Sequence, residues 1–313
     1  MGYLIIRRSG GGFFSIVATV LAHCAEAEKL GLVPWVDLET FPTPYQEENE
    51  LHGTRNVWEY YFVPVARLTR DTLRNAQVTS EKGFPSGYPD SLVNDPIYEQ
   101  MWHKYCILNQ RSRRHISKKL REFEPNSSTL GVHFRGQEQR TASRHPLPPT
   151  LRQMVGAIDH AMQAGSYERI LLATEGQQYV DFFRRRYKGR ISVTPTFRLR
   201  YQNAYKLRKA PRVNHRYSLG LETLTDAYLL GSCGGLVGCN SNLTDASSLI
   251  GDSNHSLTYV VNNGFNSPSP IFKKVNWYLK ATLPSFLGGF KSWSIATQIR
   301  FGQGVVETRG QLP

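Results

Sequence analysis

His133 and Arg135 occupy alternate positions in the stretch GVHFRGQEQR, residues 131–140. The apolar residues before them predict a strand over residues 129–134, and alternate residues of a strand point to the same face of its sheet. Open α/β sheets bind ligands at the carboxyl ends of their strands. A guanidinium there can hold a diphosphate, on which negative charge develops when it leaves as a nucleoside diphosphate. An ion pair between Arg135 and a nearby carboxylate explains the local pattern equally well.

A second polar group lies in LETLTDAYLLGSCGGLVGCNSNLTDAS, residues 221–247. Asp226 falls within an otherwise apolar helical pattern, where its carboxylate could accept hydrogen bonds from the N1 and N2 positions of guanine. Ser241 and Asn242 follow a strand and open a helix, and such positions offer donors to a phosphate or a ribose. The structural alternatives are an N-cap at Ser241 and a satisfied buried acid at Asp226. For either motif alone, the structural alternative is the commoner one.

Three glycines, residues 10–12, lie between an apolar run and a helical pattern in RRSGGGFF. Glycines at such a junction let the backbone approach a ligand closely. The stretch lacks the GxGxxG spacing, and no P-loop lysine follows it. We therefore expect it to face a ligand that is held mainly elsewhere.

The hydrophobic pattern alternates between strands and helices, which is typical of α/β proteins. It divides the chain into two Rossmann-like domains, residues 1–125 and 126–283, and a poorly patterned tail, residues 284–313. We expect strands at residues 4–6, 32–37, 129–134, 169–174, 191–193 and 235–239, and helices at residues 14–30, 98–124, 151–164, 177–187 and 218–232.

The composition narrows the class of protein. The 313 residues include 38 Lys and Arg against 25 Asp and Glu, a formal charge of +13, which favours an anionic partner. The four cysteines form no CxxC pair, so neither a disulfide framework nor a zinc site is indicated, and Cys24 and Cys233 suit buried thiols. The sequence shows neither a signal peptide nor a long apolar span. We expect a cytoplasmic protein, and peripheral binding at the inner membrane stays open.

Several motifs occur in an order that resembles a known family: SGGGFFSIVATVLAH, NVWEYYF, LGVHFRGQEQR, HPLPPTLRQM, ILLATE and TDAYLLGSCGGLVGCNSN. Together they resemble the fucosyltransferases of the rhizobial nodulation and α1,6-fucosyltransferase group, which are distant kin of the protein O-fucosyltransferases. The resemblance covers the chain from near its start to about residue 250. It implies a GT-B fold of two Rossmann-like domains facing a central cleft, and inverting transfer from GDP-fucose without a metal.

The resemblance also implies roles for particular residues. The second domain would hold the nucleotide sugar, and the first domain would lie on the acceptor side. Arg135 matches the arginine that holds the β-phosphate, and His133 matches a histidine at the donor. The remaining donor-site matches are Asp226 for guanine, Ser241 and Asn242 near the ribose and phosphate, and Gly11 and Gly12 in the first glycine-rich loop.

The chain departs from the family after Arg135, where it reads GQEQR. Glu138 stands where the family has an aspartate, and Gln139 replaces a lysine. An inverting transfer needs a group that takes the proton of the acceptor hydroxyl. Glu138 is the candidate base by elimination, and His145 and Glu175 are alternatives. A structural role for Glu138, and a packed loop position for His145, remain open.

These features lead to one expected function and its alternatives. We expect a fucosyltransferase that acts on a saccharide acceptor in bacterial surface-glycan or glycolipid synthesis. The alternatives are a nucleotide-binding pseudoenzyme and a glycosyltransferase that uses another nucleotide sugar. The chain contains no nucleic-acid recognition module, so we expect no nucleic-acid partner. The basic stretch at residues 111–121 is either a docking surface for an anionic acceptor or membrane face, or a solvated helix face.

Overall fold

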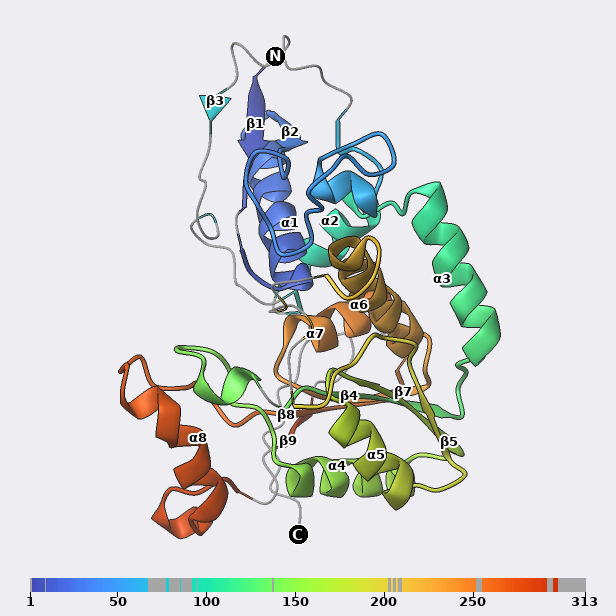
Figure 1. The fold of residues 1–313 in the computed structure, drawn as a ribbon, viewed down its shortest axis with the longest axis vertical. Coiled ribbons are helices and arrows are strands. Elements are labelled where there is room, and N and C mark those ends of the chain that lie inside the picture. The colour runs from blue at the N-terminus through green and yellow to red at the C-terminus, as the bar shows by residue number, and fades with distance from the viewer. Residues whose placement is uncertain are drawn as a thin grey trace. The chain divides into compact units, whose positions relative to one another are not determined.

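The computed structural model describes residues 2–8, 10–66, 77–78, 85, 92–93, 95–136, 138–201, 204, 207, 210–251, 255–291 and 295–297 (Figure 1). Only the backbone is described at residues 77, 78, 138 and 295–297. The chain forms two compact units. The first contains Met1–Arg121 and Leu207–Thr225, and the second contains Glu122–Lys206 and Asp226–Pro313.

The first unit contains a parallel sheet in the order β2-β1-β3, formed by β1 Tyr3–Ile6, β2 Val33–Val36 and β3 Gln77–Val78. Helix α1 Phe13–Lys29 connects β1 to β2 and is buried along most of its length. The predicted strand, helix and second strand at the start of the chain are thereby confirmed.

The glycines before α1 have different backbone requirements. Gly10 and Gly11 have φ of 69° and 84°, in the left-handed region that side chains with a Cβ rarely adopt. Gly12 is the N-cap of α1 with φ of −76° and ψ of 159°, which any residue can adopt. The turn therefore requires glycine at positions 10 and 11 and only tolerates it at position 12.

Aromatic side chains fill the core of the first unit. Tyr61, from the NVWEYYF stretch, meets Phe13 at 5.0 Å in an edge-to-face arrangement and stacks on Tyr217 at 5.6 Å between ring centroids. The Tyr61 hydroxyl donates to the Tyr217 carbonyl at 3.0 Å. These contacts explain why residues 207–225, which include the start of helix α6 His215–Gly231, belong to the first unit.

The single helix predicted over residues 98–124 is wrong. The structure has two helices, α2 Ile97–Tyr105 and α3 Gln110–Phe123. The intervening segment pairs with residues 61–63, because the Val63 amide donates to the Ile107 carbonyl at 2.8 Å and the Asn109 amide donates to the Tyr61 carbonyl at 3.0 Å. Asn109 Oδ1 then accepts from the Ser112 amide and starts α3. A long-range backbone pairing has overridden the local helical pattern.

The second unit contains a six-stranded sheet in the order β6-β5-β4-β7-β8-β9. The first five strands are parallel, and β9 runs antiparallel to β8. This confirms a mixed α/β, Rossmann-like class, whereas the GT-B arrangement of two domains stays a prediction. The strands are β4 Thr129–Phe134, β5 Arg169–Thr174, β6 Ile191–Val193, β7 Gly235–Cys239, β8 Leu257–Val261 and β9 Ile295–Thr297.

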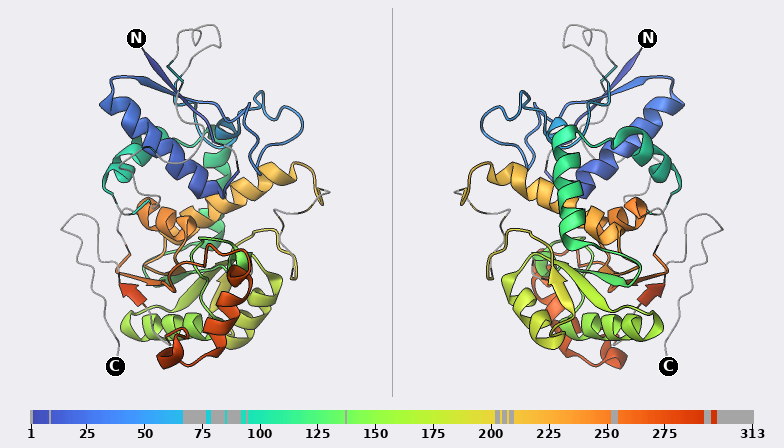
Figure 2. Two further views of the ribbon diagram at one scale, coloured as in Figure 1. Left: turned by 90° about the vertical axis from the view of Figure 1, so that its left-hand side faces the viewer. Right: turned by 90° about the vertical axis from the view of Figure 1, so that its right-hand side faces the viewer.

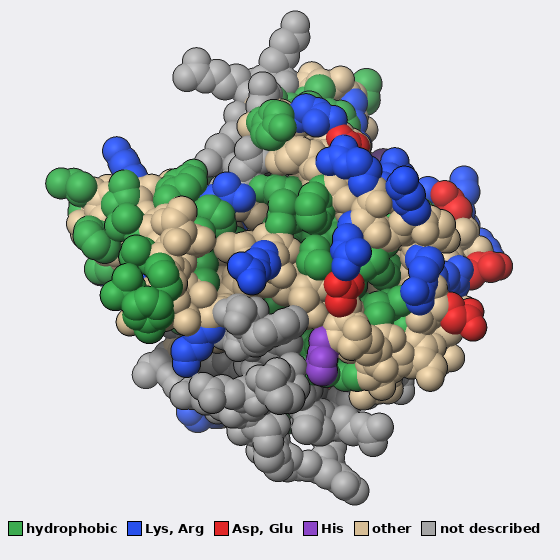
Figure 3. All heavy atoms as spheres, turned by 90° about the horizontal axis from the view of Figure 1, so that it is seen from below, with side chains coloured by type: hydrophobic (Ala, Val, Ile, Leu, Met, Phe, Trp, Pro, Cys, Tyr) green, Lys and Arg blue, Asp and Glu red, His purple; other side chains and the backbone are tan. Residues whose placement is uncertain are grey.

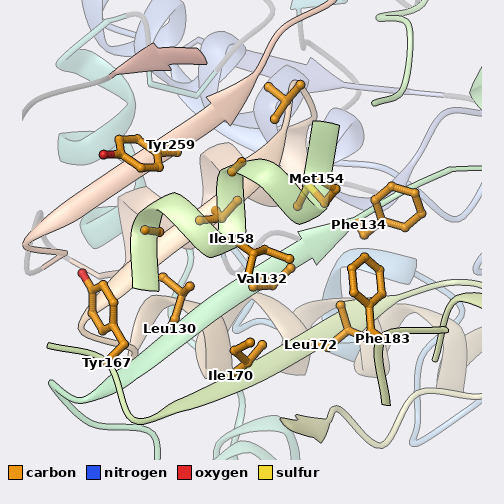
Figure 4. Close-up of a cluster of buried hydrophobic side chains, with 14 of the residues drawn as sticks. Leu130, Val132, Phe134, Met154, Ile158, Tyr167, Ile170, Leu172, Phe183 and Tyr259 are labelled. Atoms are coloured by element: carbon orange, nitrogen blue, oxygen red, sulfur yellow. The ribbon is translucent and has the colours of Figure 1, made fainter. Parts of the chain in front are cut away.

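Helices cover both faces of this sheet (Figures 1 and 2). Helices α4 Leu151–Ala164 and α5 Gln177–Arg186 lie on one face, and α7 Asn242–Ile250 lies on the other. Leu130, Val132 and Phe134 of β4 point into the core under α4 and α5 (Figure 4). Because side chains alternate along a strand, His133 must lie on the opposite face, beneath α7.

Residues after 250 add elements that the sequence pattern did not predict. Strand β8 is followed by α8 Phe272–Thr282, a short 3₁₀ helix η5 Ser285–Leu287 and β9. The Trp277 indole donates to the Pro148 carbonyl at 2.8 Å, and the Asn276 amide donates to Asn266 Oδ1 at 3.0 Å. These two buried side chains fasten α8 to the second unit.

The glycine-rich turn provides a matched pair of substitutions. Gly11→Ala should lower the free energy of unfolding by about 1–2 kcal/mol, the cost of a left-handed conformation for a residue with a Cβ. The free energy of unfolding of Gly12→Ala should stay within about 0.5 kcal/mol of the wild-type value. Alanine is a less favourable N-cap than glycine, but it also restricts the unfolded chain, and these two effects offset each other. Urea denaturation measures both variants, and equal losses would contradict this account of the turn.

Candidate functional site

The strand order of the second unit reverses between β4 and β7. Along the chain, β5 and β6 are added on one side of β4, and β7 and β8 are added on the other. Open α/β sheets bind ligands outside the carboxyl ends of the strands at such a point. His133 and Arg135 lie at the carboxyl end of β4, and Ser241 follows β7. The fold therefore brings three of the predicted site residues to the expected place.

The imidazole of His133 connects β4 to the first turn of α7. Its Nδ1 lies 2.9 Å from Thr244 Oγ1 and 3.2 Å from Ser241 Oγ. Burial, followed by the charge of Arg135, lowers the pKa of His133 to about 3. The ring is thus neutral at physiological pH, and it fixes the two hydroxyl-bearing side chains relative to the sheet.

Ser241 and Asn242 form the beginning of α7. Ser241 is the N-cap, and its Oγ accepts from the Thr244 amide at 3.3 Å. Asn242 is the first residue of the helix, and the buried Asp245 lies in the first turn. The capping interpretation of Ser241 is therefore observed. The same end of α7 carries the positive pole of the helix dipole, which favours an anionic ligand.

Arg135 follows β4 and contacts residues at the ends of the neighbouring strands β5 and β7. Its backbone hydrogen-bonds the Cys239 thiol at the end of β7, and its Nε lies 3.6 Å from Glu175 Oε2 just after β5. The side chains of Arg135 and Glu175 are 34% and 24% exposed, and partly exposed ion pairs contribute only about 0–1 kcal/mol. The ion-pair alternative for Arg135 is thus observed, as a weak contact.

Tyr179 holds both ends of the loop after Arg135. A Cβ added at Gly136 would lie 2.8 Å from both Tyr179 Oη and Phe134 Cε1, so a larger residue there would displace these side chains. At the other end, Arg140 Nη2 donates to Tyr179 Oη at 3.3 Å, and its guanidinium lies 4.0 Å from the centre of the Trp277 ring.

Glu138 lies within this loop, at the start of the 3₁₀ helix η3 Glu138–Thr141. Its side chain lies outside the described part of the chain, so its assignment as general base stays a prediction. Glu175 lies beside Arg135, as described above. His145 also interacts with Arg135, since partial burial and then the Arg135 charge lower the pKa of its imidazole.

Asp226 is buried in α6, where Thr196 Oγ1 lies 2.9 Å from Oδ1 and 3.0 Å from Oδ2 of its carboxylate. The interpretation as a satisfied buried acid is therefore observed. The contact fixes the orientation of the carboxylate.

Arg198 organises the loop that carries Thr196, and our sequence interpretation missed both residues. The Arg198 guanidinium donates to the carbonyls of Thr174, Thr194 and Thr196 at 2.7–2.8 Å. The sequence feature that could have indicated Thr196 and Arg198 is the position of TPTFR just after strand β6, at the carboxyl edge of the sheet.

The remaining predicted residues, Gly11 and Gly12, lie in the first unit, at the start of α1. Within the described residues, no group of three or more His, Cys, Asp and Glu side chains is arranged to hold a metal ion. All four cysteines are buried and unpaired, as was predicted for Cys24 and Cys233.

No family model and no curated protein matches this chain. Solved structures do match it. The NodZ α-1,6-fucosyltransferase soaked with GDP-fucose has a TM-score of 0.56 at 15% identity, over 85% of this chain and 98% of that one. For fucosyltransferase NodZ from Bradyrhizobium the TM-score is 0.54 at 16% identity, over 84% and 96%. For POFUT1 in complex with GDP it is 0.51 at 11% identity, over 82% and 96%.

The chain has the fold of these fucosyltransferases. The resemblance predicted from the ordered motifs is therefore confirmed for the fold. The roles of individual residues stay predictions.

The buried imidazole makes a prediction about stability and pH. A histidine in the unfolded chain takes up a proton below pH of about 6.5, whereas His133 in the folded protein does so only near 3. The unfolded state therefore binds more protons in this window, and stability falls as the pH is lowered. Compared with His133→Gln, the wild type should lose an additional ~1.4 kcal/mol per pH unit.

Urea denaturation of both proteins between neutral pH and pH of about 4 measures this difference. The buried His23 and His255 also have lowered pKa values, and their contribution cancels because both proteins contain them. Parallel pH curves for the two proteins would show that His133 is not the group responsible.

Proposed function

We propose that this protein is an inverting glycosyltransferase that transfers fucose from GDP-fucose to a saccharide acceptor. The shared fold supports the proposal, since relatives with this fold have been solved with GDP-fucose and with GDP. The observation that carries it is the position of Arg135, at the end of β4 where the strand order reverses. A diphosphate bound at this point would meet a guanidinium and the amino end of α7.

The Arg135–Glu175 contact is weak enough to be exchanged for a ligand. The pair is partly exposed and 3.6 Å long, so a diphosphate that carries more charge can compete for the guanidinium. We assign Arg135 to the β-phosphate. Negative charge grows on that group as the bond between the sugar and the diphosphate breaks, and a fixed cation lowers the barrier to that step.

The other side chains of the second unit would select and orient the nucleotide. We assign the Asp226 carboxylate, already oriented by Thr196, to the N1 and N2 donors of guanine. Ser241 and Asn242 are assigned to the ribose and phosphate, at the amino end of α7. His133, which contacts Ser241 and Thr244, is assigned to the donor site as well. The role of Gly11 and Gly12 in donor binding is part of the same proposal.

In the proposed reaction, an acceptor hydroxyl attacks the anomeric carbon opposite the leaving diphosphate. A base takes the hydroxyl proton as the new glycosidic bond forms, and the electrons of the old bond pass to the β-phosphate. Glu138 is the proposed base, with Glu175 and His145 as alternatives near Arg135. His145 suits this role chemically because its lowered pKa keeps the imidazole neutral and able to accept a proton. We propose that Arg135, and no metal, neutralises the leaving group.

Substitution of Arg135 tests the proposal directly. Arg135→Ala should reduce GDP release from GDP-fucose, in the presence of acceptor glycans, by about 10²–10³-fold, as expected for loss of a charged transition-state contact. The activity of Arg135→Lys should fall between those of the wild type and Arg135→Ala, because lysine keeps the charge but loses the bidentate geometry. The control is Arg186→Ala, which removes an ion pair between Arg186 on α5 and Asp159 on α4.

A folded Arg135→Ala protein with near wild-type turnover would exclude this site. Calorimetric binding of GDP by the wild type without consumption of any donor sugar would instead support a nucleotide-binding protein without transferase activity. The altered GQEQR stretch, in which glutamines occupy two of the loop positions, is the observation that favours this second function.

Asp226 provides a separate test of base selection. Asp226→Asn replaces one of two acceptor oxygens with a donor, so GDP should bind about 10–100-fold more weakly, whereas UDP binding should change little. Titration calorimetry measures both nucleotides, and thermal denaturation checks that the variant is folded. Asp181→Asn on the exposed side of α5 is the matched control. Equal losses for GDP and UDP would show that Asp226 does not contact the base.

A further inference from the structure

Helix α8 and the turn after it expose a contiguous apolar surface. Single apolar side chains on a protein surface are common, whereas a contiguous group marks an interaction site. Figure 3 shows hydrophobic side chains gathered over α8 and η5. We call this group the α8 patch and define it by its main exposed side chains, Ile271, Phe272, Val275, Tyr278, Leu279 and Phe286.

The patch is a regular stripe along α8. Phe272, Val275 and Leu279 follow the three- and four-residue spacing that places side chains on one face of a helix. The opposite face of α8 carries the buried Trp277, which fastens the helix to the protein. A surface helix normally turns its apolar stripe toward the core, but α8 directs it to the solvent.

The helix that carries the patch is held independently of the exposed side chains. Trp277 donates to the Pro148 carbonyl and lies under the guanidinium of Arg140. Ile271 and Phe286 are 80% and 84% exposed, so they contribute little to the core. Polar substitutions at these two positions should therefore leave the protein folded.

The surroundings of the patch are cationic. The sequence from residue 265 to residue 291 contains Lys273, Lys274, Lys280 and Lys291 and no aspartate or glutamate. Lys274 and Lys291 are exposed, and Lys273 and Lys280 are partly exposed. Lys273 and Lys280 lie four residues before and three residues after the buried Trp277, on the fastened side of the helix, whereas Lys274 is exposed. An apolar stripe with an exposed lysine on a fixed helix is an arrangement that inserts into the interfacial region of a bilayer.

We propose that the α8 patch docks on a membrane surface that contains anionic lipids. The apolar and aromatic side chains would enter the boundary between headgroups and acyl chains, while the lysines contact the lipid phosphates. A second copy of the chain fits less well, because a symmetric contact would bring each group of lysines against its equivalent. Within the described residues, no helix is both long and apolar enough to cross a bilayer.

Helix α3 is a weaker candidate for the same partner. Its exposed side chains include Arg111, Arg113, Arg114 and Lys118, and its buried side chains are Ser112 and Ile116. It offers charge without apolar side chains that could insert. The membrane surface considered for residues 111–121 is therefore better placed at α8, and this inference does not depend on the proposed transferase activity.

Vesicle co-sedimentation of the full chain tests the proposal. The protein should sediment with vesicles of phosphatidylcholine and phosphatidylglycerol, and much less with phosphatidylcholine alone. The Ile271→Ser/Phe286→Ser double variant should bind at least about tenfold more weakly, because it removes two inserting side chains. Lys274→Gln should weaken binding about fivefold, the effect of one lysine near an anionic surface.

Matched controls separate the patch from general surface effects. Val213→Ser removes an 86% exposed apolar side chain in the first unit, and Arg113→Gln removes an exposed charge on α3. Both should bind vesicles like the wild type. Vesicle binding that is absent, or equally strong in the double variant, would overturn the proposal. Light scattering that shows a dimer broken by the double variant would overturn it in favour of a second copy.

Discussion

The alternation of side chains along β4 is the constraint on which the second unit depends. Leu130, Val132 and Phe134 enter the core under α4 and α5, and this leaves His133 on the opposite face, where it meets Ser241 and Thr244 of α7. A shift of one residue in the register of β4 would place a guanidinium in the core under α4 and α5 and move Phe134 to the face beneath α7. The packing of these three apolar residues thus decides where the cation at position 135 can be.

The polar groups at the carboxyl edge of this sheet are fixed before any ligand binds. His133 is held by hydroxyls, Asp226 by Thr196, and the loop around Thr196 by three carbonyl contacts from Arg198. Arg135 differs, because its contact with Glu175 is partly exposed and weak. Fixed polar groups lower the entropy cost of recognition, and a cation in a weak ion pair can exchange its carboxylate partner for an anionic ligand.

The sequence predicted the strands and helices that are determined by the hydrophobic pattern of their own residues. The strands at residues 129–134, 169–174, 191–193 and 235–239 and the helix at residues 151–164 match the structure, because their apolar periodicity agrees with their burial. The break between α2 and α3 was not predictable, since it depends on backbone pairing of residues 107–109 with residues 61–63. The Thr196–Asp226 contact joins residues 30 positions apart and leaves no local pattern. The apolar residues of α8 did not indicate which face of the helix would pack against the protein and which would face the solvent.

The contacts of Tyr179 limit how the stretch after β4 can change in length. Its hydroxyl crowds Gly136 at one end of the loop and accepts from Arg140 at the other, and Arg140 is also stacked on Trp277. Three residues, Gln137, Glu138 and Gln139, connect these two anchors. An inserted or deleted residue would move Arg140 away from Tyr179 or from the Trp277 ring, and α8 would lose one of its supports.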